Sequence, residues 1–255
     1  MNRLAALAFA MVLVAGGAAE AERLPVALSP PEVTINSNFA GTTVTVFGVI
    51  ARDAAALSNV GTYDIAVLLM GPPETRVARR KQRFLGIWAN GASETFEAVP
   101  AFYSLSTSVN VEDLTTPPVL ARLQLGFDNI AFRYEGRAVT NDPAASDFRD
   151  AFIRLKNGAG LYHEQVGVRF IGNLIFRTTF YLPANISIGW YTADAYLFSN
   201  RQLIATAKDS LRISKTGLED TLSTFARSQS LVYGLICVAL ALVIGWLGGV
   251  IFRRD

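Results

Sequence analysis

The densest group of charged side chains in this chain lies between residues 76 and 83. It consists of Arg76, Arg79, Arg80, Lys81 and Arg83, at a place where two β-strands should be joined. Guanidinium groups offer paired N–H donors to oxyanions, so several converging from a hairpin could bind phosphate, sulfite, sulfate or a lipid headgroup. If these residues instead alternate along a strand, their side chains point to opposite faces, and the cluster is a solvated surface.

Few other residues could carry chemistry. His163 is the only histidine, which excludes metal sites built from several histidines, and its neighbour Glu164 diverges from it in any regular structure. The only cysteine, Cys237, lies in a C-terminal apolar segment, so the rest of the chain has no thiolate chemistry and no disulfide. We therefore expect no catalytic residues, no metal site and no cofactor, and we expect that the protein is not an enzyme.

The charge balance argues against a nucleic-acid partner. The 255 residues include 23 Lys and Arg and 21 Asp and Glu, which gives a formal net charge of +2. Binding to a phosphate backbone requires a strongly basic surface, and so small an excess does not supply one.

The C-terminal apolar segment predicts a membrane anchor. Residues 231–252 contain no charged side chain, and as a helix they extend roughly 33 Å, enough to cross a hydrocarbon core about 30 Å thick. Arg253 and Arg254 follow directly, and basic residues that flank a span resist translocation. We therefore expect a transmembrane helix over 231–252 and a cytoplasmic tail over 253–255.

Small residues recur along this segment. Ala241, Gly245 and Gly249 are spaced every four residues, which places them on one helix face and permits close contact with another helix. Glycine and alanine are also common in such helices without any such role. If the face is used, its partner is a second copy of the chain or another integral membrane protein.

The N-terminus predicts a signal peptide over residues 1–21. A short basic start, an apolar stretch and the small-x-small sequence Ala19-Glu20-Ala21 fit a cleavable signal, with an uncleaved anchor as the alternative. Together with the cytoplasmic tail, this topology places the folded domain in the periplasm of a bacterium and the span in the inner membrane. A domain without cysteine suits that compartment.

Residues 22–215 predict a mainly β fold. Alternating apolar residues predict strands at 42–50, 63–69, 84–88, 94–99, 174–182, 191–198 and 202–213. Asn90-Gly91 predicts a hairpin turn between the third and fourth of these strands, and Trp88 is expected to pack in the core or at its rim. Helical patterns follow at 119–124 and 147–158.

The last three strands resemble the end of an immunoglobulin-like sandwich. Tyr191 follows a corner that contains Pro183 and Gly189, the place of a tyrosine corner, although it could equally be an ordinary core aromatic. Joining early and late strands predicts one sandwich with a helical insertion at about 100–165, and two small domains are the alternative. A capping pattern at Thr216 predicts a stalk helix over 216–230 that continues into the span.

Several strings in this sequence resemble a family of alphaproteobacterial transmembrane proteins that has no assigned activity. They keep their order over nearly the whole chain: Arg79-Arg80-Lys81, Gly86-Ile87-Trp88-Ala89-Asn90, Val99-Pro100-Ala101-Phe102-Tyr103, Gly160-Leu161-Tyr162, Leu182-Pro183-Ala184-Asn185, Tyr233-Gly234, Gly245-Trp246 and Phe252-Arg253-Arg254. The resemblance implies a signal peptide, a periplasmic domain and one C-terminal span. Genes of such proteins often neighbour those of sulfite-exporter-type permeases, which implies an accessory role in sulfur-oxyanion export. The family offers no catalytic residues.

Two functions fit these observations. The leading hypothesis is an accessory or assembly subunit, mounted in the membrane beside a partner such as a sulfite-exporter-type permease. The alternative is a periplasmic sensor that binds an oxyanion through the basic cluster. An enzyme that uses His163 ranks third.

Overall fold

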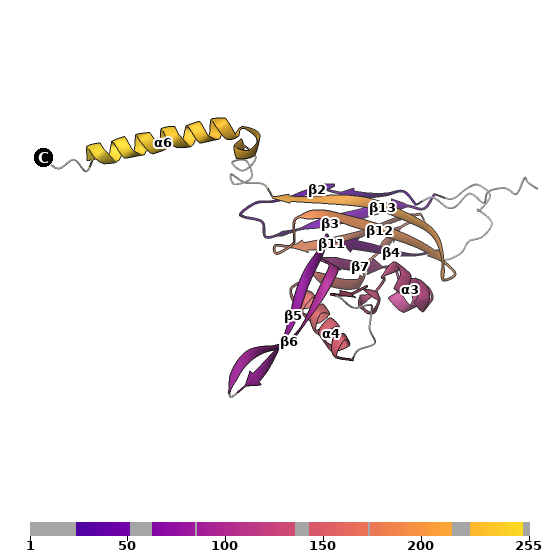
Figure 1. Ribbon diagram of the computed structural model, residues 1–255. Helices are drawn as coiled ribbons and strands as arrows, with labels where there is room; N and C mark the ends of the chain where they lie inside the picture. Colours follow the sequence, from indigo (N-terminus) through magenta and orange to yellow (C-terminus); the bar gives the residue numbers. More distant parts are fainter. Residues whose placement is uncertain are drawn as a thin grey trace, which may run out of the picture.

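The computed structural model describes residues 24–51, 63–84, 86–135, 143–172, 174–215 and 225–251. The expected signal peptide, the residues 216–224 of the expected stalk and the tail 253–255 lie outside these ranges. The described chain is mainly β, with two large sheets, a smaller third sheet, a group of helices beside it and an apolar C-terminal helix (Figure 1).

The first large sheet has four antiparallel strands. Their order is β1 (Val26–Ser29), β3 (Gly41–Val49), β11 (Ile175–Pro183) and β10 (Arg169–Ile171). The pairing of β3 with β11 runs the full length of both strands, from Gly41 opposite Pro183 to Val49 opposite Ile175.

The second large sheet has six strands and a parallel pair at each edge. Their order is β2 (Glu32–Ile35), β13 (Gln202–Lys215), β12 (Gly189–Ser199), β4 (Tyr63–Met70), β7 (Tyr103–Thr107) and β9 (Tyr162–Val166). The strand β2 runs parallel to β13, and β9 runs parallel to β7. Each large sheet thus combines strands from the early part of the chain with strands from the late part.

The two large sheets pack face to face around one apolar core. Alternate residues of β3 and β11, such as Val46 and Phe180, meet alternate residues of β4 and β12, such as Val67 and Ala193, and all four are buried. Burial of each large apolar side chain contributes roughly 1.5–3 kcal/mol. This core, rather than any disulfide, holds the sandwich together.

The strand order matches that of an immunoglobulin-like sandwich. One sheet follows the order A-B-E-D, and the strands β13, β12, β4 and β7 follow the order G-F-C-C′ in the other. The Tyr191 hydroxyl donates a 2.6 Å hydrogen bond to the carbonyl of Ser187, four residues upstream, which confirms the tyrosine corner. Ala193, two residues later, takes the place of the second cysteine of antibody domains and is fully buried. The prediction of an immunoglobulin-like sandwich is confirmed.

Additional elements fill the connections on both sides of β7. Before β7 comes the hairpin of β5 (Pro73–Phe84) and β6 (Ile87–Pro100), which joins β8 (Arg133–Tyr134) in the third sheet. After β7 come α2 (Val111–Leu114), α3 (Pro117–Leu123), the 3₁₀ turn η2 (Phe127–Asn129) and α4 (Pro143–Gly158). These helices confirm a helical insertion. The prediction that the strands at 84–88 and 94–99 belong to the sandwich is wrong, because β5 and β6 lie in the third sheet.

A second core lies under these elements. Phe96, Phe132, Phe152 and Tyr162 form a cluster of rings whose centroids lie 5.2–6.1 Å apart. The strand β4 separates the two cores, so Ala66 and Leu68 face the second core while their neighbours face the first. Burial on both faces explains why β4 is a continuous apolar run rather than an alternating one.

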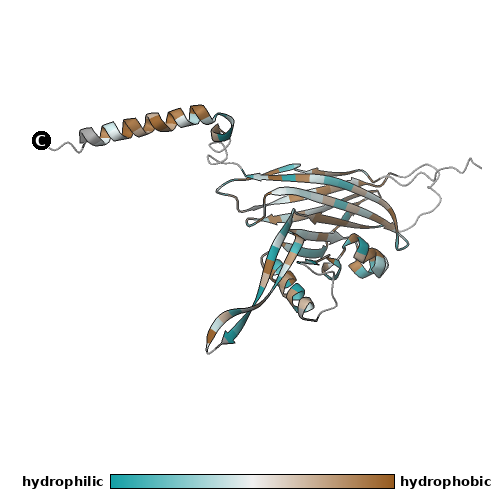
Figure 2. Ribbon diagram, in the orientation of Figure 1, coloured by the Kyte–Doolittle hydropathy of each residue, from teal (hydrophilic) through white to brown (hydrophobic). Residues whose placement is uncertain are grey.

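The C-terminal helix α6 spans Ser230–Ile251 and is apolar all round (Figure 2). Its segment Ser230–Gly248 is long and apolar enough to cross a membrane, with a mean hydropathy of 2.4. Residues 225–228 form a helical turn before it, and the backbone bends at Gln229. The expected uninterrupted helix from stalk to span is therefore broken at that residue.

Candidate functional site

The β5–β6 hairpin forms an arm that projects from the sandwich, and all five basic residues of the predicted cluster lie on it (Figure 1). The chain reverses between Phe84 and Ile87, which face each other across the two strands. Gly86 supplies the positive φ of +86° that this tight connection requires. The predicted turn at Asn90-Gly91 is therefore wrong.

Asn90 and Gly91 instead belong to a β-bulge in β6. Arg79 lies opposite Ser93 and Lys81 lies opposite Asn90, so β6 contributes one residue more than β5 over this interval. A Cβ atom on Gly91 would lie 2.5 Å from the side chain of Gln82, so any larger residue there would require the exposed Gln82 side chain to move. The glycine signal was real, but it marked a bulge rather than a turn.

The arm separates the five basic residues onto two faces. Arg76 and Arg80 lie on the face directed at α4, where each forms an ion pair: Arg76 with Glu74 at 2.7 Å and Arg80 with Asp147 at 2.9 Å. The Arg80 guanidinium also lies 5.2 Å from the centre of the Phe148 ring. Two of the five are thus occupied by interactions within the protein.

The other three, Arg79, Lys81 and Arg83, occupy every second position of β5 and therefore share its opposite face. Trp88 lies opposite Arg83 and therefore shares this face. Among the described residues, no carboxylate pairs with any of these three cations. Successive cations on one face of a strand are about 6.6 Å apart, so they form a row rather than a pocket for one small oxyanion.

The tip of the arm is apolar and exposed. Ile87 is 73% exposed and Trp88 is 67% exposed, and the whole of β6 up to Ser93 faces solvent. The expectation that Trp88 packs in the core or at its rim is wrong. Trp88 lies beyond the last residues of the arm that contact α4, so no core is within its reach.

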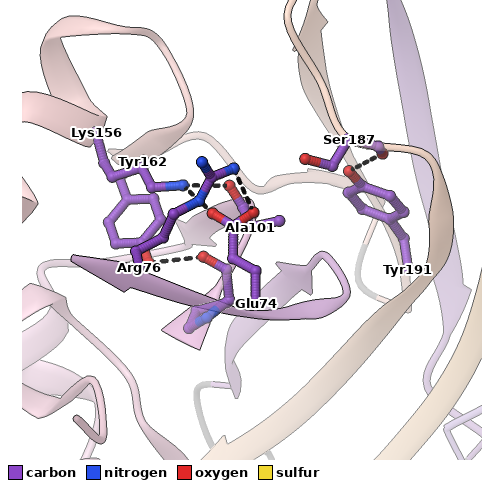
Figure 3. Close-up of polar contacts among 8 residues, drawn as sticks. Glu74, Arg76, Ala101, Lys156, Tyr162, Ser187 and Tyr191 are labelled. Atoms are coloured by element: carbon purple, nitrogen blue, oxygen red, sulfur yellow. Dashed lines mark hydrogen bonds and ion pairs between the residues drawn. The ribbon is translucent and has the colours of Figure 1, made fainter. Parts of the chain in front are cut away.

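The root of the arm is held by a largely buried ion pair (Figure 3). The Lys156 ammonium, at the end of α4, donates to the Glu74 carboxylate at 2.6 Å and to the carbonyl of Ala101 at 3.2 Å. It also lies 5.5 Å and 5.7 Å from the ring centres of Phe152 and Tyr162. The side chains of Lys156 and Glu74 are only 11% and 17% exposed.

The electrostatics of the root favour the charged form of the Glu74 carboxyl. Burial raises the pKa of the Glu74 carboxyl, but hydrogen bonds from Arg76 and Lys156 outweigh that effect, so the pKa lies below its usual value. Burial also raises the pKa of the Tyr162 hydroxyl, which stays protonated and donates to the carbonyl of Pro100 at 2.8 Å. The root therefore serves to attach the arm rather than to move protons.

His163 does not lie at the root. It follows Tyr162 on the edge strand β9, is exposed, and alternates with Glu164, so the two side chains point to opposite faces. Glu164 accepts a hydrogen bond from the backbone N–H of Phe127, and its partial burial raises its pKa. Within the described ranges, no three His, Cys, Asp or Glu side chains are grouped closely enough to hold a metal ion.

Two open hollows flank the inserted elements. One, of about 700 Å³, is lined by residues of both charges, among them Arg80, Asp128, Asp150 and Arg154. The other, of about 400 Å³, is lined by Glu112, Asp113 and Glu164 together with uncharged side chains. Neither hollow contains the row of Arg79, Lys81 and Arg83.

The predicted contact face of the span lies on α6. All side chains from 231 to 247 are exposed, and a Cβ atom on Gly245 would meet nothing within 4 Å. Cys237 precedes Ala241 by four residues and so lies on the same helix face as Ala241, Gly245 and Gly249. The sequence interpretation did not include Cys237, although its spacing was visible.

Comparison with known proteins identifies one family. The model of the family described as "Putative transmembrane protein (Alph_Pro_TM)" matches residues 23–254, which confirms the resemblance seen in the sequence. No match was found among curated proteins.

Proposed function

Since the chain belongs to the Alph_Pro_TM family of transmembrane proteins, we propose that it is a non-enzymatic accessory subunit in the bacterial inner membrane. The immunoglobulin-like domain lies in the periplasm, the C-terminus is cytoplasmic, and α6 contacts an integral membrane partner. The observation that carries this proposal is that no described part of the domain covers α6. All its side chains from 231 to 247 are exposed, whereas the sandwich has a complete core of its own.

An apolar helix without protein cover must be covered by lipid or by other helices. In lipid, helices associate where small residues let their backbones approach, and the face of Cys237, Ala241, Gly245 and Gly249 provides that over three turns. The partner is then another membrane protein. A sulfite-exporter-type permease is the candidate that the family resemblance suggests, and it is proposed on that ground alone.

The topology follows from the two ends of the sequence. In the sequence, Arg253 and Arg254 follow the apolar segment and favour a cytoplasmic C-terminus, and the signal-like residues 1–21 favour export of the domain. Alkaline phosphatase fused after Asp255 should be inactive in cells, because that enzyme requires the periplasm. An active fusion would contradict the orientation.

The alternative, an oxyanion sensor, requires the basic cluster to converge. Arg76 and Arg80 are paired with carboxylates on one face of the arm, and Arg79, Lys81 and Arg83 lie in a row on the other. This arrangement gives the accessory subunit better support than the sensor.

Photo-crosslinking from the small-residue face tests the proposal. A photo-reactive residue at Ala241 should form an adduct with a second membrane protein in native membranes, whereas the same residue at Val243, about 200° around the helix, should not. Equal yields at the two positions, or no adduct with any protein, would contradict a specific helix partner.

Oxidation of Cys237 distinguishes contact with a different membrane protein from contact with a second copy of this chain. If the face joins two copies, mild oxidation of membranes should link Cys237 into a disulfide dimer, and the control C237A/A239C, with its thiol on the opposite face, should stay monomeric. A dimer formed in quantitative yield, with no other protein captured from Ala241, would replace the accessory subunit by a homodimer.

A further inference from the structure

We infer that the tip of the β5–β6 arm is a second membrane-binding element, which inserts Ile87 and Trp88 into the surface of the bilayer that α6 crosses. The row of Arg79, Lys81 and Arg83 then binds the phosphates of anionic phospholipids. The inference depends on the span but not on any protein partner.

The tip has the chemistry of a bilayer interface. Ile87 and Trp88 are 73% and 67% exposed, and they place one apolar side chain on each face of β6 near the most distant point of the arm. Trp is well suited to the interface, because its ring is apolar while its N–H donates a hydrogen bond. Exposed apolar surface of this kind marks a site of contact rather than a solvated loop.

The basic residues follow the tip in the order that a bilayer requires. Arg83 lies directly opposite Trp88, Lys81 is two residues further from the tip, and Arg79 is two further again. A bilayer presents hydrocarbon first and headgroup phosphates just above it, so the apolar tip and the cations behind it meet matching layers. A row of cations about 6.6 Å apart suits neighbouring headgroups better than one free oxyanion.

The arm starts from the end of the sandwich that leads to the membrane. Its root follows Met70, which lies opposite Thr192 near the start of β12, and Gly189 at that start lies opposite Ile213 near the end of β13. The chain leaves the same end at Lys215 toward α6. The arm and the tether therefore leave from the same end of the six-stranded sheet, with β12 between them.

The lengths are compatible with simultaneous contact. Residues 216–229 connect the sandwich to α6; with 225–228 helical, their greatest possible reach is about 40 Å. The arm extends about 36 Å from Pro73 to Phe84 at about 3.3 Å per residue. A domain held within reach of its tether can thus place the tip on the bilayer.

Fluorescence of Trp88 in nanodiscs tests this inference with the full chain. The substitutions Trp190→Phe and Trp246→Phe leave Trp88 as the only tryptophan. In discs that contain phosphatidylglycerol, its emission should shift to shorter wavelength, and lipids labelled near the headgroup should quench it. In discs of phosphatidylcholine alone, we expect at least tenfold less of the inserted state, because each basic residue near an anionic surface favours binding about fivefold.

Matched charge variants distinguish a specific role of the basic row from general electrostatic attraction between the domain and an anionic membrane. Lys81→Gln with Arg83→Gln should reduce the equilibrium constant for insertion about 25-fold. Arg169→Gln with Arg177→Gln removes the same charge from the outer face of the four-stranded sheet and should leave quenching of Trp88 unchanged. Equal effects of the two pairs would overturn the inference.

Two further outcomes would also overturn it. One is equal access of aqueous iodide to Trp88 in detergent and in phosphatidylglycerol discs, which would show that the tip stays in water. The other is release of the tip by millimolar inorganic phosphate at constant ionic strength, which would show that the row binds a free oxyanion. Both measurements need only lipid and this chain, so they are independent of whether α6 has a protein partner.

Discussion

The root and the tip of the β5–β6 arm both contain basic and aromatic residues, but these are buried and paired at the root and exposed at the tip. At the root, Lys156 is nearly buried and its ammonium contacts Glu74, a backbone carbonyl and two aromatic rings. At the tip, Lys81 and Arg83 lie beside the exposed Trp88 with no carboxylate partner among the described residues. Desolvated charges need their partners to keep the fold stable, whereas solvated charges remain available for something outside the chain.

The largest effect should come from breaking the root. Lys156→Met leaves the Glu74 carboxylate with only Arg76, and loss of one partner from a buried pair costs about 3 kcal/mol, at the lower end of the usual range because Glu74 keeps some solvent. Thermal unfolding of the full chain in detergent should show a Tm lower by about 6–12 °C. Lys81→Met is the matched control and should change Tm by less than about 2 °C. Equal losses would remove the distinction between root and tip.

A hydrogen bond near the root gives the next effect. Tyr191→Phe removes the donor to the Ser187 carbonyl inside a buried corner and should cost about 1–1.5 kcal/mol. Tyr181→Phe is the control, because Tyr181 is exposed and its hydroxyl makes a longer contact of 3.3 Å with the Ala40 carbonyl. Denaturant titrations of both variants measure the difference, which should vanish if the corner is not a stabilising feature.

The pH dependence of stability should distinguish two glutamates. The pKa of Glu74 is lowered in the folded protein, so its contribution is complete above the ordinary pKa of about 4.5 and is lost as the pH falls through the lower folded value. Glu74→Gln should therefore flatten the loss of stability in acid. Burial raises the pKa of Glu164, so this group favours folding at low pH and Glu164→Gln should steepen the same loss. Unfolding midpoints measured between pH 3 and pH 6 check both signs, and equal slopes would contradict the assignment.

The smallest effect concerns Arg80, which lies between root and tip. Its ion pair with Asp147 is exposed, so Arg80→Gln should cost about 0.5 kcal/mol or less in the free energy of unfolding. Arg83→Gln should cost nothing measurable. A cost above about 1.5 kcal/mol for Arg80→Gln would mean that its contact with Phe148 fastens the arm more firmly than the exposed geometry indicates.

Much of the sandwich could be predicted because its strands have local signals. The strands β3, β11 and β12 alternate along their length, and Tyr191 follows a corner with proline and glycine, so period and punctuation identify them. The arm could not be predicted in the same way. Gly86 and Gly91 could each lie in a turn between two strands, and only the pairing of β5 with β6 shows that the turn is at Gly86.

The candidate site shows the same limit. Five basic residues close in sequence are visible at once, but the pairing of Arg80 depends on Asp147 of α4, 67 residues away. The partnership of Glu74 with Lys156 has no signal in the sequence, since 82 residues separate them. The exposure of Trp88 was missed because an aromatic residue on a strand usually finds a core.

The amino-acid sequence alone determines that this is a mainly β domain with an apolar segment long enough to cross a membrane, because periodicity and hydropathy are properties of neighbouring residues. The tertiary structure decides which charges are buried and paired, and which stand exposed on the arm. Those outcomes depend on contacts between residues far apart in the chain, and the desolvation of each group is set by everything that packs around it.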